Sequence, residues 1–305
     1  MSNTVSDFII DRFFDCGFRR IYGYLGADDT AASMIGPVAK IFFLLLTCAG
    51  LILPFPLAAD SVAVRFQEGL VHGFLTLRTS GGSIVAVGDL MQTAKGDRVT
   101  SNLIFHFKDG SLHEETTVFS QTGKFQLLNY HLVQKGPAFK SPKETSLDVS
   151  TGQFTVHYQD DNGKDKVLTE HLEIPADVAN GMVPMLLKNL QSAGTPTTLS
   201  MVVATPKPRI VKLAITSQGE GSVLIGGVSR KASHLVVKVE LGGVAGVVAP
   251  IVGKQPVDSQ IWILGGGFPV LVRSEGQMFE GGPIWTIEQT SPVWPQKPKG
   301  DASKK

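Results

Sequence analysis

The sequence predicts a mainly β protein in which an antiparallel meander forms a curved sheet, a sandwich or an incomplete barrel. From residue 60 to residue 295, short segments rich in β-branched and aromatic residues show alternating polarity. Glycine-containing turns such as Lys95-Gly96-Asp97 and Lys108-Asp109-Gly110 separate these segments. A parallel sheet would require crossover helices between its strands, and the sequence shows no pattern for them.

Nine strand candidates precede the first break in this pattern. They span residues 62–66, 72–78, 83–91, 98–107, 112–119, 124–133, 145–149, 153–158 and 166–173. Between the last two, Asp161-Asn162-Gly163-Lys164 has the composition of a hairpin turn. We therefore expect neighbouring strands in this region to pair with each other.

The pattern then changes to helical spacing, which predicts one short or kinked helix near residues 175–190. Its apolar residues are Val178, Met182, Met185, Leu186 and Leu190, and Gly181 and Pro184 interrupt it. Seven further strand candidates follow at residues 198–203, 209–216, 221–226, 233–240, 260–264, 269–274 and 284–288. The β-rich domain at 60–295 has a candidate sub-boundary near 191–197, so one domain and two both stay open. Residues 296–305 are expected to be a disordered, solvated tail.

An export signal precedes the β-rich region. The apolar run Ile41–Leu53 follows Lys40 and is ended by Pro54 before Leu57-Ala58-Ala59, which is the order of a signal peptide. We expect the signal at residues 34–59, cleavage near Ala59, and a secreted or periplasmic product. A buried helix or an uncleaved membrane anchor is the alternative. Because Cys16 and Cys48 precede the cleavage site, the mature chain would be cysteine-free and have no disulfide or thiolate chemistry.

The run from Val5 to Gly26 resembles the opening helix and strand of thiamine-diphosphate-dependent enzymes of the pyruvate oxidase and acetolactate synthase type. The resemblance covers residues 4–29, with Leu25 in place of the family's usual proline. The strand that carries the family's cofactor-activating glutamate does not follow, so no catalytic residue can be transferred. One helix and one strand cannot bury a core, and residues 1–33 are expected to be a fragment rather than an independent domain.

The β-rich region, residues 60–295, resembles bacterial secreted β proteins of unknown function that are built as curved antiparallel sheets or incomplete barrels. The strand series and the insertion Leu172–Met182 carry this resemblance. It implies the architecture and an export route but no chemistry.

Composition and motifs exclude several classes of function. A formal net charge of +1 gives no electrostatic footprint for nucleic acid. No Gly-x-Ser-x-Gly motif is present, and the glycine runs at 242–246 and 265–267 lack the lysine of a phosphate loop. The sequence therefore predicts no catalytic residue, no cofactor and no metal site, and it leans against an enzyme. The alternatives are a hydrolase with histidines and carboxylates on adjacent strands, such as His106, His113 and Glu115, and thiamine-diphosphate binding through the N-terminal fragment.

The leading hypothesis is an exported, non-enzymatic β protein that binds a hydrophobic ligand or an envelope partner. The partner would be a lipid, another hydrophobic small molecule or an envelope protein, with membrane contact only through an uncleaved signal. The segment with Asp177, Asn180, Gly181 and Met182 would cap the open end of the curved sheet, and packing of a helix on the sheet is its alternative. The candidate pocket residues are Phe105, Phe107, Leu127, Tyr130, Met182 and Met185.

Overall fold

The structure is a computed structural model that describes residues 61–160, 162–190, 196–204, 207–225, 227–241 and 256–290. These residues belong to one compact unit, Ala58–Lys305. The predicted signal at 34–59, the thiamine-enzyme-like segment at 1–33 and the tail at 296–305 lie outside the described residues. They stay predictions.

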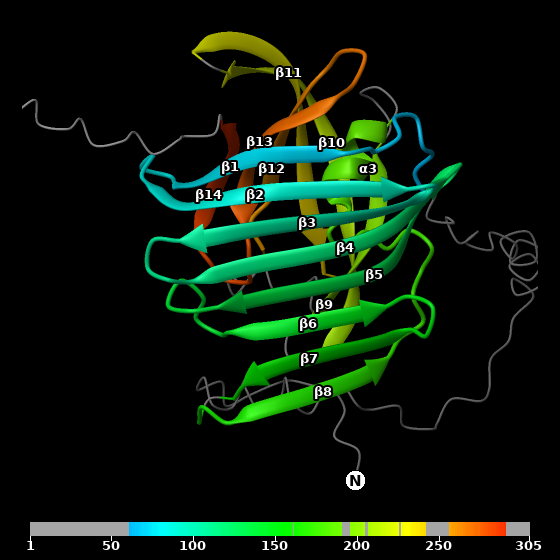
Figure 1. Cartoon of the computed structure of the whole chain (residues 1–305), viewed down its shortest axis with the longest axis vertical. Coiled ribbons are helices and arrows are strands. Elements are labelled where there is room, and N and C mark those ends of the chain that lie inside the picture. The colour runs from blue at the N-terminus through cyan, green and yellow to red at the C-terminus, as the bar shows by residue number, and fades with distance from the viewer. Residues whose placement is uncertain are drawn as a thin grey trace, which may run out of the picture. The chain divides into compact units, whose positions relative to one another are not determined.

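The described residues form one antiparallel sheet of fourteen strands and one short helix, which confirms the predicted fold class (Figure 1). The first eight strands are β1 (Val71–Thr79), β2 (Ile84–Lys95), β3 (Arg98–Phe107), β4 (Leu112–Thr122), β5 (Lys124–Lys135), β6 (Lys143–Asp148), β7 (Gln153–Gln159) and β8 (Asp165–His171). The helix α3 (Val183–Asn189) comes next. The last six strands are β9 (Thr197–Ala204), β10 (Pro208–Ile225), β11 (Val228–Glu240), β12 (Ser259–Leu264), β13 (Val270–Gln277) and β14 (Ile284–Thr290).

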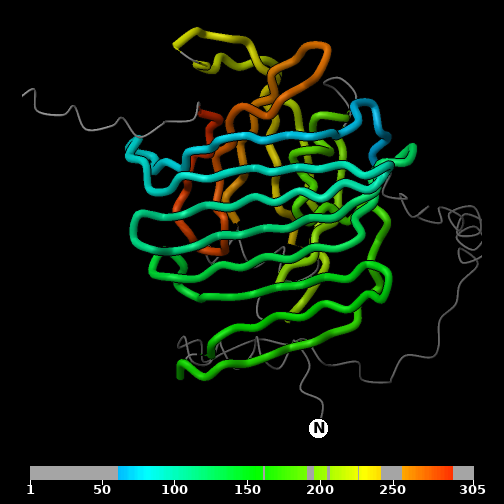
Figure 2. Tube along the Cα trace, viewed as in Figure 1, coloured from blue at the N-terminus to red at the C-terminus, as the bar shows by residue number. Residues whose placement is uncertain are grey.

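The two halves of the sheet are joined at β1, which pairs with β2 on one side and with β14 on the other. The strand order runs from β8 through β1 and β14 to β9, so β8 and β9 are the two ends and the sheet is not closed. Figures 1 and 2 show the strands β9 to β14 behind the strands β2 to β8. A sheet that curls in this way can bury its own concave face.

Side-chain alternation decides which residues enter the concave face. In β3, Phe105 and Phe107 are buried while His106 between them is exposed, as the sequence predicts. The larger core cluster joins both halves of the sheet with α3, for example through Phe119, Leu213 and Leu186. A smaller cluster around Phe105, Phe107, Phe139 and Trp285 fills the region next to β1 and β14.

Three strand candidates were wrong in extent. Residues 62–66 do not form a strand and make only an isolated bridge between Ala63 and Lys124. The candidates at 209–216 and 221–226 are one strand, β10, whose register shifts between Ser217 and Glu220. The predicted short helix near 175–190 is confirmed at Val183–Asn189, where Gly181 precedes it at φ 68° and Pro184 lies in its first turn.

In the part of the chain that the structure describes, α3 is the one helix, and it is too short to cross a lipid bilayer.

Candidate functional site: a groove at the rim of the sheet

The structure divides the six predicted pocket residues between the two core clusters. Phe105 and Phe107 belong to the smaller cluster, next to Phe139 and Trp285. The other four, Leu127, Tyr130, Met182 and Met185, belong to the larger cluster. Among the six, Leu127 and Tyr130 border a surface pocket, one each.

Leu127 borders a groove of about 440 Å³ at one rim of the curved sheet. The groove lies between the start of β3, the middle of β5, the turn after β6 and the segment before α3. Its apolar lining residues are Leu127, Leu128, Val149, Ile174, Pro175, Ala176 and Val178, and its polar lining residues are Arg98, Gln126, Asn129, Asp148 and Ser150.

The wall formed by the β6–β7 turn is fixed by hydrogen bonds. The Val149 amide donates to the Leu128 carbonyl at 3.1 Å, which joins the turn to β5. Asp148 Oδ1 accepts from the hydroxyl of Ser150 at 2.6 Å and from its amide at 2.9 Å. These bonds, with a further one from the Thr151 amide, lower the pKa of Asp148. The turn is thus preformed with an ionised carboxylate at the groove.

The opposite wall, residues 174–178, is held by a buried polar group on β9 and β10. Ser200 Oγ donates to Asp177 Oδ1 at 2.7 Å, and Lys212 Nζ lies 3.3 Å from Asp177 Oδ2. Farther along the segment, the Asn180 side chain donates to the Val202 carbonyl and accepts from the Val202 amide, each at 2.8 Å. Asn180 therefore pairs with the edge strand β9 as another strand would.

This polar group is structural rather than nucleophilic. Lys212 Nζ also lies 2.7 Å from Ser200 Oγ, a distance suited to a Ser-Lys catalytic pair. However, Ser200 is fully buried and its hydroxyl proton is directed to Asp177. No substrate carbonyl can reach that oxygen without displacing the segment that covers it.

The rim of the groove carries one positive and one negative side chain, Arg98 and Asp148. Within the described part of the chain, neither side chain forms an ion pair. The two charges remain available to a molecule that enters the groove.

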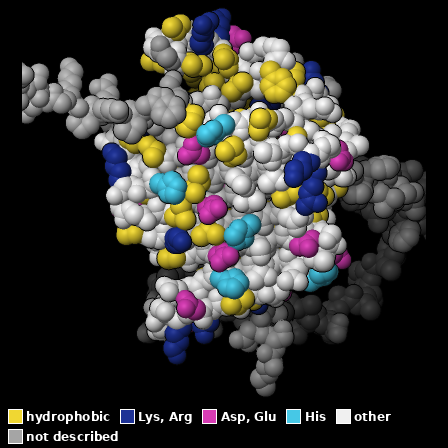
Figure 3. Space-filling view, viewed as in Figure 1, with side chains coloured by type: hydrophobic (Ala, Val, Ile, Leu, Met, Phe, Trp, Pro, Cys, Tyr) yellow, Lys and Arg dark blue, Asp and Glu magenta, His cyan; other side chains and the backbone are white. Residues whose placement is uncertain are grey.

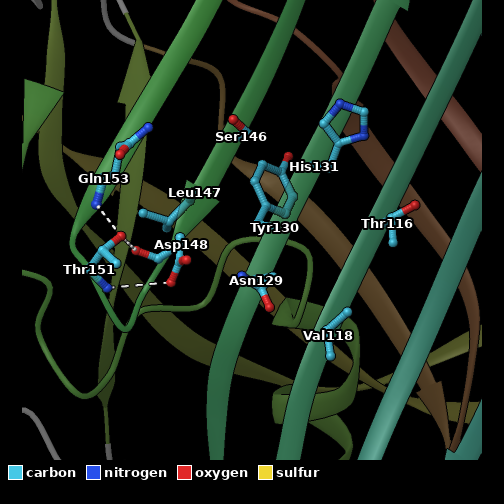
Figure 4. A pocket seen from close by; sticks show the side chains of 10 residues that line it. All are labelled: Thr116, Val118, Asn129, Tyr130, His131, Ser146, Leu147, Asp148, Thr151 and Gln153. Carbon is cyan, nitrogen blue, oxygen red and sulfur yellow. Dashed lines mark hydrogen bonds between the residues drawn. The ribbon is translucent and has the colours of Figure 1, made fainter. Parts of the chain in front are cut away.

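Tyr130 borders a second pocket of about 320 Å³ on the outer face of β4, β5 and β6 (Figure 4). Polar side chains dominate its lining, among them Thr116, Asn129, His131 and Ser146. Its lining also includes Val118 and Leu147, so its exposed surface is no more polar than that of the groove.

The Tyr130 side chain belongs to the larger core cluster on the concave face, and Tyr130 pairs with Thr117 of β4. Burial, together with the negative charge of Glu115 and a hydrogen bond to it, raises the pKa of Tyr130 well above its usual value. Gly181 packs against the same place, since a Cβ on it would lie 1.9 Å from Thr117 Oγ1 and 3.0 Å from Glu115 Oε1. The predicted cap segment therefore contacts β4 as well as β9.

His113 lies on the same strand face as Glu115, with its ring between Phe105 and Phe139. Gln134 Nε2 donates to the Met278 carbonyl at 2.9 Å and lies 3.1 Å from His113 Nδ1, so Nδ1 accepts and the proton is on Nε2. His113 Nε2 is 3.9 Å from Glu115 Oε2 and makes no hydrogen bond. With its side chain 6% exposed, this ring cannot meet a substrate from solvent.

The remaining six histidines do not join His113. All seven lie in the described residues, and the other six are exposed or half-buried. Two pair with carboxylates on the outer face: His72 with Asp89 at 3.1 Å and His131 with Glu144 at 2.9 Å. Figure 3 shows histidines beside acidic residues over this face. The described residues also include no group of three or more His, Cys, Asp or Glu able to hold a metal ion.

Most of the groove was not predicted from the sequence. Val149 was predicted at the end of a strand and Arg98 at the start of one, while Ile174 was placed in the insertion Leu172–Met182. Pro175, two residues after the strand candidate at 166–173 and just before a polar segment, is the signal that could have located this wall.

No protein-family model matches the chain, and no curated protein matches it. Among solved structures, the chain is similar to a β-barrel-like protein of the domain of unknown function DUF1849 from Brucella abortus. The TM-score is 0.40 at 11% identity, over 73% of this chain and 98% of the other. It is also similar to the hypothetical lipoprotein YmcC from Escherichia coli, with a TM-score of 0.35 at 10% identity, over 86% of this chain and 99% of that one.

Proposed function

We propose that this chain is an exported, non-enzymatic protein that binds an amphiphile in the groove beside Leu127. The observation that carries the proposal is the groove itself, a half-apolar concavity of about 440 Å³ with fixed walls. Ligand sites of small molecules generally measure about 300–1,000 Å³ and combine apolar walls with a few polar groups.

The lining supports an acyl chain rather than a compact polar molecule. Leu128, Val149 and Ile174 are half-buried at the groove and lose further apolar surface to water when a chain covers them. The groove is too small for a two-chain lipid, so a single chain fits it better.

The rim supports a zwitterionic headgroup. Arg98 offers a guanidinium suited to a phosphate, and Asp148 offers a carboxylate suited to an amine. A ligand with a single negative charge would meet attraction at Arg98 and repulsion at Asp148. Lysophosphatidylethanolamine, which carries one acyl chain, a phosphate and an amine, is therefore the probe of choice.

The test is an equilibrium titration of the full chain with this lysolipid below its micellar concentration. Ala176, exposed at the groove, is changed to tryptophan to fill it. We expect Ala176→Trp to weaken binding by about tenfold or more, and Arg98→Gln by about fivefold through loss of the charged hydrogen bond.

Ser80→Trp, in the exposed turn between β1 and β2, is the matched control and should bind as the wild type does. Equal affinity of the Ala176→Trp variant and the wild type would place the ligand elsewhere. Absence of binding of both the lysolipid and a fatty acid would refute the proposal.

A further inference from the structure

The tip of the β10–β11 hairpin is apolar and exposed. Leu224 is 77% exposed, Val228 52% and Ile225 37%, and the three lie within five residues of each other. Ile225 pairs with Val228 across the hairpin, so the apolar side chains close the end of the ribbon. Figure 1 shows this hairpin projecting past β1 at one end of the sheet, where the β12–β13 hairpin also projects.

Three other tight hairpins of the sheet have polar tips, whereas the turn between β12 and β13 carries Phe268, which is 54% exposed. The turns between β2 and β3, between β3 and β4, and between β7 and β8 contain Gly96, Asp109 and Asp160, with neighbouring lysines. A turn does not need aliphatic residues, and a cluster of exposed ones lowers solubility. Such a cluster therefore indicates a contact surface. The inner face of the hairpin is already used, because Val223 packs with Val272 and Trp262.

Two basic side chains follow this tip on β11. Arg230 pairs with Val223 and Lys231 with Ser222 across the ladder, and both basic residues are exposed. The carboxylate nearby is Glu220, whose Oε2 lies 3.5 Å from Lys231 Nζ, with both side chains more than half exposed. An apolar tip followed by cations fits an anionic lipid surface, where acyl chains lie beneath phosphates.

We propose that the β10–β11 tip docks on an anionic lipid bilayer, with Leu224, Ile225 and Val228 inserted at the interface and Arg230 and Lys231 at the phosphates. A narrow, convex, two-stranded tip buries little area against a protein, whereas specific protein interfaces generally need about 1,200 Å² or more. A bilayer accepts such a tip because its interface is soft. This proposal does not rest on the groove or on its ligand.

The test is hydrogen exchange of the full chain with and without vesicles of phosphatidylcholine and phosphatidylglycerol. We expect the amides of residues 220–232 to exchange about fivefold more slowly with these vesicles, and less so with phosphatidylcholine alone or at high salt. Because the measurement reports only on the amides of the hairpin, vesicle binding through the apolar residues 41–53 would not by itself slow their exchange.

The triple variant Leu224→Ser, Ile225→Ser, Val228→Ser should lose this slowing while keeping the wild-type melting temperature. Val167→Ser removes an aliphatic residue that is 62% exposed on β8 and should keep the slowing. Unchanged exchange at 220–232 with anionic vesicles would overturn the proposal. Slowing that grows with protein concentration in the absence of lipid would also overturn it, in favour of a second copy of the chain.

Discussion

Gly181 shows how one residue fixes the segment beside the groove. Its φ of 68° lies in the left-handed region, and a Cβ there would come within 1.9 Å of Thr117 Oγ1. Only glycine meets both conditions without moving β4 or the segment. The sequence singled out this residue as a helix breaker, but its close approach to a strand more than sixty residues away could not be read from local pattern.

We therefore expect Gly181→Ala to lower the free energy of unfolding by about 2–4 kcal/mol, the sum of backbone strain and overpacking. Gly163→Ala is the matched control, because φ is 74° there and no atom lies within 4 Å of the added Cβ. For the control, urea unfolding should show a loss of about 1–2 kcal/mol in the free energy of unfolding, from backbone strain alone. Equal losses of stability at the two positions would mean that Gly181 is not in close contact with Thr117.

Lys143 is a residue whose charge the fold disfavours. Burial lowers its pKa, and the negative charge of Glu280 offsets part of this effect. The unfolded chain therefore binds more protons than the folded one between the lowered pKa and the ordinary lysine pKa. Stability should rise with pH through that window, because the cost of the buried ammonium is present below it and disappears above it.

Lys143→Met should thus be more stable than the wild type at neutral pH, and the difference should shrink as the pH rises towards about 10.4. Thermal unfolding at several pH values measures this difference. Lys95→Met, at the exposed end of β2, provides the baseline. A gain for Lys143→Met that stays constant with pH would exclude the ammonium as its cause.

At the scale of elements, alternation and turn composition predict where the strands lie in the sequence, but not where each strand begins and ends. The Gly219-Glu220-Gly221 stretch has the composition of a turn, yet β10 continues through it with a shifted register against β11. The long β11 supplies hydrogen bonds on both sides of the irregularity, so tertiary pairing overrides the local signal.

Residues 62–66 illustrate the reverse case. Their alternation predicts a strand, but the backbone amides of Arg65 and Phe66 donate to Asn189 Oδ1 on α3 at 2.8 and 2.7 Å. Glu68, just beyond, is buried against Gln92, Gln121 and Lys188. A side chain more than 120 residues away thus takes the place of a partner strand, and no local pattern could indicate it.

Asn189→Ala should release this segment, because two partly buried amides lose their shared acceptor, at about 0.5–1.5 kcal/mol for each hydrogen bond. Hydrogen exchange should accelerate at residues 62–68 ahead of the rest of the sheet. Asn189→Asp keeps an acceptor and should retain most of the protection, while Asn102→Ala, exposed on β3, should change nothing. Protection that survives Asn189→Ala would show that the segment is held by other contacts.

At the scale of the molecule, the sequence predicts an antiparallel meander but not the way in which it curls. The pairing of β1 with β14 joins residues more than 200 positions apart, and this pairing brings the two halves of the sheet over a common core. The groove depends on that curl, since its walls come from β3, β5, the β6–β7 turn and the segment before α3. Leu127 and Tyr130 could be predicted as inward residues, whereas the rim charges could not.

The central claim is that an amphiphile occupies this groove. Native mass spectrometry of the protein purified from its own host measures occupancy directly. The account predicts an added mass that matches a single-chain amphiphile, is lost on denaturation, and is absent or strongly reduced in Ala176→Trp. A wild-type protein with no added mass, or the same added mass in the wild type and the Ala176→Trp variant, would contradict it.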